Sequence, residues 1–238
     1  MLLDTSNLFP KAEKKPIKAD IVICLDVTGS MQPVIDALKN NLINFVDTLQ
    51  KEGQIDFRLR LIAYRDLHDT SIREGRRVCE EPWFESSFTK DVNEFSNWLS
   101  LPVIQAYGGG DEPESTLDAL YRAVKSDWRE NKTHRVICLM TDDDTHMTLD
   151  ESTYDKPDRQ EGLNRVIQEL QTLKHSALYM ILPRYHAYER LQEAVKDCED
   201  GNRKVIAKYV PDDDKGLLTV DWSSFLDMLA NSVSQSCI

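Results

Sequence analysis

The feature that most constrains the fold is a short apolar run, Ile21-Val22-Ile23-Cys24-Leu25, that ends abruptly at Asp26. An unbroken run of this length, rich in β-branched residues, predicts a strand that is buried on both faces of a parallel sheet. Pro33 is then placed to open a helix, because apolar residues recur at helical spacing after it. The stretch therefore predicts a strand, a tight polar turn and a helix, with oxygen-bearing side chains at the carboxyl end of the strand.

The spacing Asp26-x-Thr28-x-Ser30 in this turn predicts a site for a hard divalent cation. Mg2+ prefers carboxylate, hydroxyl and water oxygens, and it takes few protein ligands because it keeps several waters. Three short oxygen-bearing side chains on one turn meet that requirement. The simpler alternative is a turn whose side chains only cap the next helix, and this segment alone leaves both interpretations open.

Composition narrows the class of function. The chain has 238 residues, with 29 Lys and Arg against 41 Asp and Glu, and its formal charge of -12 argues against nucleic acid or an anionic membrane as partner. It contains no apolar stretch long enough to span a bilayer and its start lacks the features of a signal peptide, so we expect a cytoplasmic protein. The five cysteines and five histidines show no spacing typical of a zinc site.

Strand and helix patterns alternate along the chain. Residues 1–19 contain Pro10 and Pro16 and are expected to form an N-terminal lead-in, and residues 20–238 are expected to form one domain. The alternation predicts an α/β, Rossmann-like, doubly wound domain, whose mostly parallel sheet is flanked by helices on both faces.

Two more strand ends carry polar residues. The strand that ends at Tyr64 is followed by Arg65 and Asp66, and open α/β sheets bind ligands at such carboxyl ends. A local salt bridge between Arg65 and Asp66 that braces the loop is the alternative. The strand Arg135–Met140 is followed by Thr141 and then by a run of acids and a nearby histidine, which are Asp142, Asp143, Asp144 and His146. For Asp143 and Asp144 individually, a solvated charge run is the alternative.

A glycine-rich segment lies between these strands: Tyr107-Gly108-Gly109-Gly110-Asp111-Glu112-Pro113-Glu114. Three glycines allow the backbone to approach an ion closely, and the neighbouring acids add negative charge. The segment lacks the Gly-Lys-Ser/Thr ending of a phosphate-binding loop. Pro113 is expected to begin a helix whose buried stripe extends to Trp128.

Four motifs in order resemble the von Willebrand factor A family, over about residues 20 to 235. The resemblance is closer to bacterial intracellular members of the family, which read Asp-x-Thr-Gly-Ser-Met, Tyr-Arg-Asp, Gly-Gly-Gly-Asp-x-Pro-Glu, and Thr-Asp followed by His. This chain supplies residues 26–31, residues 64–66, residues 108–114, and Thr141-Asp142 with His146.

The resemblance implies a metal-ion-dependent adhesion site. Asp26, Thr28 and Ser30 would be its first-loop ligands, directly or through water, and Asp142 its third-loop carboxylate. Most members place Thr after the glycines, but this chain has Asp111 there and Thr116 five residues later. We favour Asp111 as the second-loop ligand, with Glu114 as the competitor. Possible accessory residues are Arg65, Asp66, Glu114, Thr116, Asp143 and His146.

The implied function is Mg2+-dependent protein binding, with Mn2+ or Ca2+ as the other candidate ions. In the family, an acidic side chain of another protein often completes the metal coordination, so the resemblance implies an adhesion or assembly module in a bacterial multi-protein regulatory or defence system, and not an enzyme.

Two enzyme classes are the alternatives. A metal-dependent hydrolase could use the same ion, with Asp111, Asp142 or His146 as base. A phosphotransferase of the haloacid dehalogenase type needs a second Asp where Thr28 stands.

Overall fold

The described part of the chain forms a mostly parallel, six-stranded sheet. The computed structural model describes residues 17–51, 55–68, 83–107, 113–130, 132–196, 203–211 and 216–235. The strands are β1 (Ile17–Asp26), β2 (Ile55–Tyr64), β3 (Trp83–Glu85), β4 (Thr133–Met140), β5 (Ser176–Pro183) and β6 (Arg203–Val210). Their order is β3-β2-β1-β4-β5-β6, and every neighbouring pair is parallel except β2 with β3. The predicted α/β fold class is confirmed.

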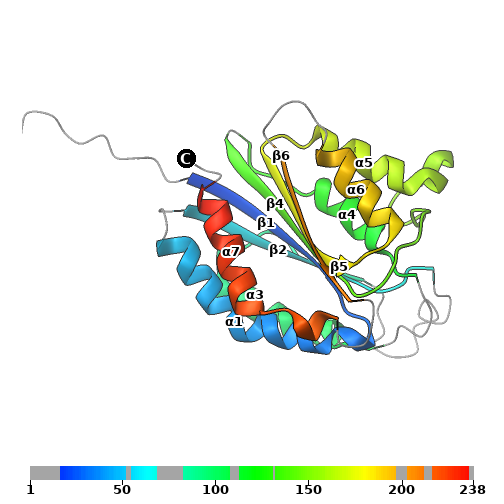
Figure 1. Cartoon of the computed structure of the whole chain (residues 1–238). Coiled ribbons are helices and arrows are strands. Elements are labelled where there is room, and N and C mark those ends of the chain that lie inside the picture. Colours follow the sequence, from blue (N-terminus) through cyan, green and yellow to red (C-terminus); the bar gives the residue numbers. More distant parts are fainter. Residues whose placement is uncertain are drawn as a thin grey trace, which may run out of the picture.

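Helices cover both faces of this sheet. They are α1 (Gln32–Lys51), α3 (Val92–Leu99), α4 (Thr116–Val124), α5 (Gly162–Thr172), α6 (His186–Lys196) and α7 (Trp222–Gln235). Figure 1 shows α1, α3 and α7 on one face and α4, α5 and α6 on the other. No helix among the described residues has the length and apolar character needed to cross a membrane.

The central strand β1 explains this two-sided packing. Ile21, Ile23 and Leu25 belong to the hydrophobic core shared with α1, α3 and α7. The alternate residues Val22 and Cys24 belong to the core shared with α4, α5 and α6. Because successive side chains of a strand point to opposite faces, an unbroken apolar run is what a strand between two helix layers requires.

Short turns join the elements around the sheet. The first of them, η1 (Gly29–Met31), begins α1 directly after β1. The others are η3 (Pro102–Ile104), η4 (Pro157–Glu161) and η5 (Leu217–Thr219). The first strand, β1, begins at Ile17, within the range 1–19 that was expected as the lead-in.

The expected limits of α4 were wrong at both ends. The helix begins at Thr116 and not at Pro113, because the backbone of Glu114 pairs with another segment: its N–H donates to Asp144 O at 3.1 Å, and its carbonyl accepts from His146 N at 2.9 Å. The helix ends at Val124, so Trp128 lies beyond it and donates its indole N–H back to Val124 O at 2.9 Å.

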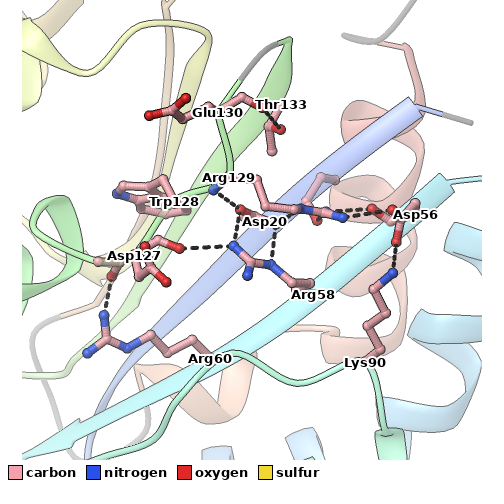
Figure 2. Close-up of polar contacts among 12 residues, drawn as sticks. Asp20, Asp56, Arg58, Arg60, Lys90, Asp127, Trp128, Arg129, Glu130 and Thr133 are labelled. Carbon is pink, nitrogen blue, oxygen red and sulfur yellow. Dashed lines mark hydrogen bonds and ion pairs between the residues drawn. The ribbon is translucent and has the colours of Figure 1, made fainter.

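An ion-pair network around the buried Asp20 braces the amino edge of the sheet (Figure 2). Asp20 is fully buried in β1, and its carboxylate accepts hydrogen bonds from Arg58 and Arg129. Arg129 also donates to Asp56 Oδ2 at 2.8 Å, and Lys90 pairs with Asp56 at 2.6 Å. Ion pairs and hydrogen bonds of this kind offset the large desolvation cost of the buried Asp20 carboxylate. At about 3.3 Å per residue, Asp20 lies roughly 20 Å along the strand from Asp26.

Candidate metal centre at the carboxyl edge of the sheet

Three neighbouring strands end at the same edge of the sheet. In the order β2-β1-β4, their last residues are Tyr64, Asp26 and Met140. The ends of β1 and β4 carry four of the predicted metal ligands, and the end of β2 carries two possible accessory residues: Asp26, Thr28, Ser30 and Asp142, and Arg65 and Asp66. Parallel pairing therefore brings together the loops after residues 26, 64 and 140, as expected for ligand sites in open α/β sheets.

Asp26 lies at the centre of this edge and is fully buried. Its Oδ1 accepts hydrogen bonds from the backbone N–H of Thr28 at 2.9 Å and from the hydroxyl of Thr28 at 2.7 Å. Its Oδ2 accepts one from the hydroxyl of Thr141 at 2.7 Å. The bond to the N–H two residues on is that of an Asx turn, so the Asp-x-Thr spacing itself turns the chain and fixes the carboxylate.

A second carboxylate lies close enough to act on the first. Burial raises the pKa of Asp26 to about 7, and the negative charge of Asp142 adds to the shift, although the hydrogen bonds from Thr28 and Thr141 oppose it. Asp142 itself is partly buried just after β4. Two carboxylates held near each other at a buried strand end repel, and a divalent cation between them would remove the repulsion.

The donor set fits a hard cation. The side chains that the described residues bring together are carboxylates and hydroxyls, which are ligands for Mg2+, Mn2+ or Ca2+ and not for zinc. Ser30 is exposed on η1, two residues beyond Thr28. Within the ranges that the structure describes, no group of three or more His, Cys, Asp or Glu side chains is arranged to hold a metal. The favoured second-loop residue, Asp111, lies outside those ranges.

The two other second-loop candidates occupy buried positions. Thr116 is fully buried, and its hydroxyl lies 3.1 Å from the hydroxyl of Tyr64 and accepts from that of Tyr188 at 3.4 Å. Glu114 is also buried, in a bridge with Thr145. Its backbone therefore joins the second loop to the third.

Asp143 stabilises the third loop by accepting hydrogen bonds at its backbone carbonyl and at its carboxylate. Its carbonyl accepts from Tyr188 Oη at 2.7 Å, and its Oδ1 accepts from the N–H of Asp144 at 2.6 Å. Tyr188 thus contacts both Thr116 and the third loop. Sequence reasoning missed Tyr188 because nothing in the sequence shows that α6 lies against these loops.

Asp66 and His146 form a pair that joins the loop after β2 to the loop after β4. His146 Nε2 lies 2.9 Å from Asp66 Oδ1, which also accepts from the N–H of His68 at 2.7 Å. Burial acts to raise the pKa of Asp66, but the hydrogen bonds from His146 and from the His68 N–H outweigh it and lower that pKa. The imidazole of His68 lies against that of His146, with ring centroids 4.1 Å apart and ring planes tilted by 41°. Burial and the neighbouring His146 lower the pKa of His68.

Arg65 has a different role from Asp66. Its side chain is almost completely buried and donates to backbone carbonyls of residues 103–107. Thr141 was absent from the predicted site residues, although its hydroxyl is one of the groups that hold Asp26. Its place between a buried strand and Asp142 was the signal that could have identified it.

Comparison with known proteins gives a relative in sequence and several similar folds. No family model matches the sequence. The chain is 29% identical over 130 residues to the alpha-protein kinase vwkA of Dictyostelium discoideum, a match that covers 54% of this chain and 19% of that protein. The chain thus spans about a fifth of the length of this relative.

Solved structures show the fold more fully. The pilus adhesin SpaC of Lactobacillus rhamnosus GG superposes over 94% of this chain and 31% of its own, with a TM-score of 0.54 and 13% identity. A von Willebrand factor type A structure from Catenulispora acidiphila superposes over 92% of this chain and 43% of its own, with a TM-score of 0.51 and 14% identity. The chain therefore has a von Willebrand factor A-like fold.

Proposed function

We propose that this chain is a protein-binding module that works through a divalent cation, Mg2+ or else Mn2+ or Ca2+, at the carboxyl edge of its sheet. The observation that carries the proposal is the buried Asp26 carboxylate, which three hydrogen bonds orient and whose pKa burial and Asp142 raise to about 7. Asp26, Thr28, Ser30 and Asp142 would hold the ion, and Asp111 would complete the set from the second loop.

The chain's own residues fix the site and leave its outer side to a partner. Thr28 and Thr141 use their hydroxyls to orient Asp26, so that the carboxylate is positioned before any ion arrives. When bound, the cation supplies a coordination position that prefers an anionic oxygen, and a Glu or Asp of another protein would take it. The likeness in fold to a pilus adhesin supports this assignment.

The protein's setting belongs to the same proposal. We place it in the cytoplasm as an assembly component of a bacterial multi-protein regulatory or defence system. The similarity to about a fifth of a longer kinase supports the view that such a domain occurs beside effectors.

The experiment that tests this function uses Mn2+ as probe. We expect calorimetry to show that the full chain binds one Mn2+. Bound Mn2+ speeds the relaxation of water protons, and we expect this enhancement to fall when acetate displaces a water from the ion. Asp26→Asn should abolish binding. Asp36→Asn, which removes the same charge from an exposed position on α1, should leave it intact. Equal Mn2+ affinity in the two variants would overturn the assignment.

The Asp66–His146 pair supports one alternative, a metal-dependent hydrolase. A carboxylate bonded to one imidazole nitrogen is the arrangement that orients a general base, and His146 is partly exposed. Mg2+-dependent hydrolysis of p-nitrophenyl phosphate or p-nitrophenyl acetate that disappears in both Asp26→Asn and His146→Ala would establish the enzyme. We expect no turnover above that of the His146→Ala variant.

A further inference from the structure

Tyr188 lies in the first turn of α6 and is fully buried. It belongs to the buried stripe of this helix, which packs into the core that α4, α5 and α6 form with the sheet. Its hydroxyl donates to the backbone carbonyl of Asp143 at 2.7 Å and lies 3.4 Å from the hydroxyl of Thr116. The packing of α6 therefore places a hydrogen-bond donor against the third loop, residues 141–144, which follows β4.

In the third loop, Asp142 lies between two anchored residues. On one side, the hydroxyl of Thr141 donates to Asp26 Oδ2 at 2.7 Å. On the other side, the carbonyl of Asp143 accepts from Tyr188. These two bonds fix the backbone on both sides of Asp142, the carboxylate whose charge acts on Asp26.

A loop that is fixed on both sides of a ligand suits a small cation. Mg2+ requires near-octahedral oxygen ligands at about 2.0–2.1 Å, whereas Ca2+ accepts more ligands, at about 2.3–2.6 Å and in flexible geometry. Asp142 cannot move outward to the longer distances that Ca2+ uses unless the bond to Tyr188 or the bond from Thr141 is lost.

We propose that Tyr188 is a positioning residue that holds the third loop against the first and thereby makes the site select Mg2+ over Ca2+. This inference rests on the proposed metal-dependent function. Tyr188 acts through the backbone of Asp143 and not as a ligand, because its hydroxyl proton is donated to that carbonyl and its ring is buried in the core.

The test uses the full chain with Tyr188→Phe, which removes the hydroxyl and leaves the ring in the core. We expect calorimetry to show about a 10-fold loss of Mg2+ affinity, at the low end of the cost of losing a group that orients metal ligands. Ca2+ affinity should change by less than about twofold, because Ca2+ tolerates a displaced ligand. The measured quantity is the ratio of the two affinities, which a general loss of stability would leave unchanged.

Tyr179→Phe is the matched control. Tyr179 is also a buried tyrosine, in β5, but its hydroxyl donates to Ser232 Oγ of α7, on the opposite face of the sheet. Its loss should lower the melting temperature about as much as Tyr188→Phe does. Both metal affinities should stay within about twofold of the wild type, as expected for distant sites.

A second measurement needs no metal. In EDTA, the N–H groups of Asp143 and Asp144 should exchange with solvent faster in Tyr188→Phe than in the wild type. These groups donate to Thr141 Oγ1 at 3.3 Å and to Asp143 Oδ1 at 2.6 Å, and we expect both bonds to open more often once the Asp143 carbonyl is released. In Tyr179→Phe, the exchange of the third loop should match that of the wild type.

The outcomes separate this inference from the proposed function. Equal exchange of the third loop in the wild type and Tyr188→Phe would contradict the positioning role. If the wild type binds Mg2+ and Tyr188→Phe keeps the wild-type ratio of Mg2+ to Ca2+ affinity, the selection of Mg2+ by Tyr188 is wrong and the metal site stands. A wild type that binds no divalent cation would overturn the proposed function and the selectivity with it, and the exchange measurement would then decide the positioning role alone.

Discussion

Asp26 is fully buried beside Asp142, and this environment disfavours the ionised form of its carboxyl group. Its pKa is about 7 in the folded chain, against 3.8 for an ordinary Asp. The folded state therefore binds this proton more tightly than the unfolded state does. The resulting stabilisation is fully present below about pH 4 and is lost as the pH rises through about 7.

Asp26→Asn should remove most of this dependence on pH. In EDTA, the free energy of unfolding of the wild type should fall between about pH 5 and pH 8, and that of Asp26→Asn should fall less. A smaller slope should remain, because burial also raises the pKa of Asp118 to about 6. Urea unfolding at the two pH values measures the difference, and equal slopes in wild type and variant would contradict the assigned environment of Asp26. Excess Mg2+ should raise the stability of the wild type alone at the higher pH.

Local spacing predicted some of the contacts that individual site residues make and could not predict the others. Asp26 and Thr28 interact across two residues, and that contact follows from the sequence pattern. Arg65 finds its acceptors about 40 residues along the chain. The sequence indicated a charged residue at a strand end, but only the packed structure shows which carbonyl oxygens it meets.

Among the elements, the start of α5 lies unusually close to the chain beyond the third loop. A Cβ on Gly162 would come within 2.6 Å of Met147 O and 3.1 Å of Leu149 N. The N–H of Gly162 also donates to Met147 O at 3.0 Å, so this contact cannot open without the loss of a hydrogen bond. Only glycine allows this approach.

Gly162→Ala should therefore destabilise the chain, although Ala is usually the better residue in a helix by about 0.5–1 kcal/mol. Overpacking against backbone costs about 1–3 kcal/mol, which outweighs the gain in helix propensity. Gln168→Ala, at an exposed position of the same helix, should change stability by no more than about 0.5 kcal/mol. Urea unfolding of both variants checks this, and a Gly162→Ala variant as stable as the wild type would show that the loop moves freely.

The elements themselves were largely predictable, since buried strands and amphipathic helices leave strong periodic patterns. The strand at 21–25 and the helix that follows it were both expected and are observed. The start of α4 was not, because proline at position 113 favours a helix locally but the backbone of Glu114 is bonded to residues 144 and 146. A contact across 30 residues overrides a local signal.

Across the whole molecule, the buried acids at the two edges of the sheet have different hydrogen-bond partners. At the amino edge, Asp20 receives hydrogen bonds from two arginines. At the carboxyl edge, Asp26 receives hydrogen bonds from hydroxyl and backbone groups and lies beside another acid, Asp142. The amino edge is neutralised by the protein's own arginines, and at the carboxyl edge we propose that a divalent cation balances the two acids.

The metal site is tested most sharply by the anomalous diffraction of a crystal of the full chain grown with Mn2+. We predict one strong anomalous peak bounded by Asp26, Thr28, Ser30 and Asp142, with Asp111 nearer to it than Glu114. The same crystal form of Asp26→Asn should lack the peak. A wild-type crystal with no Mn2+ peak at this edge, or with its peak at another place on the molecule, would contradict the proposed site.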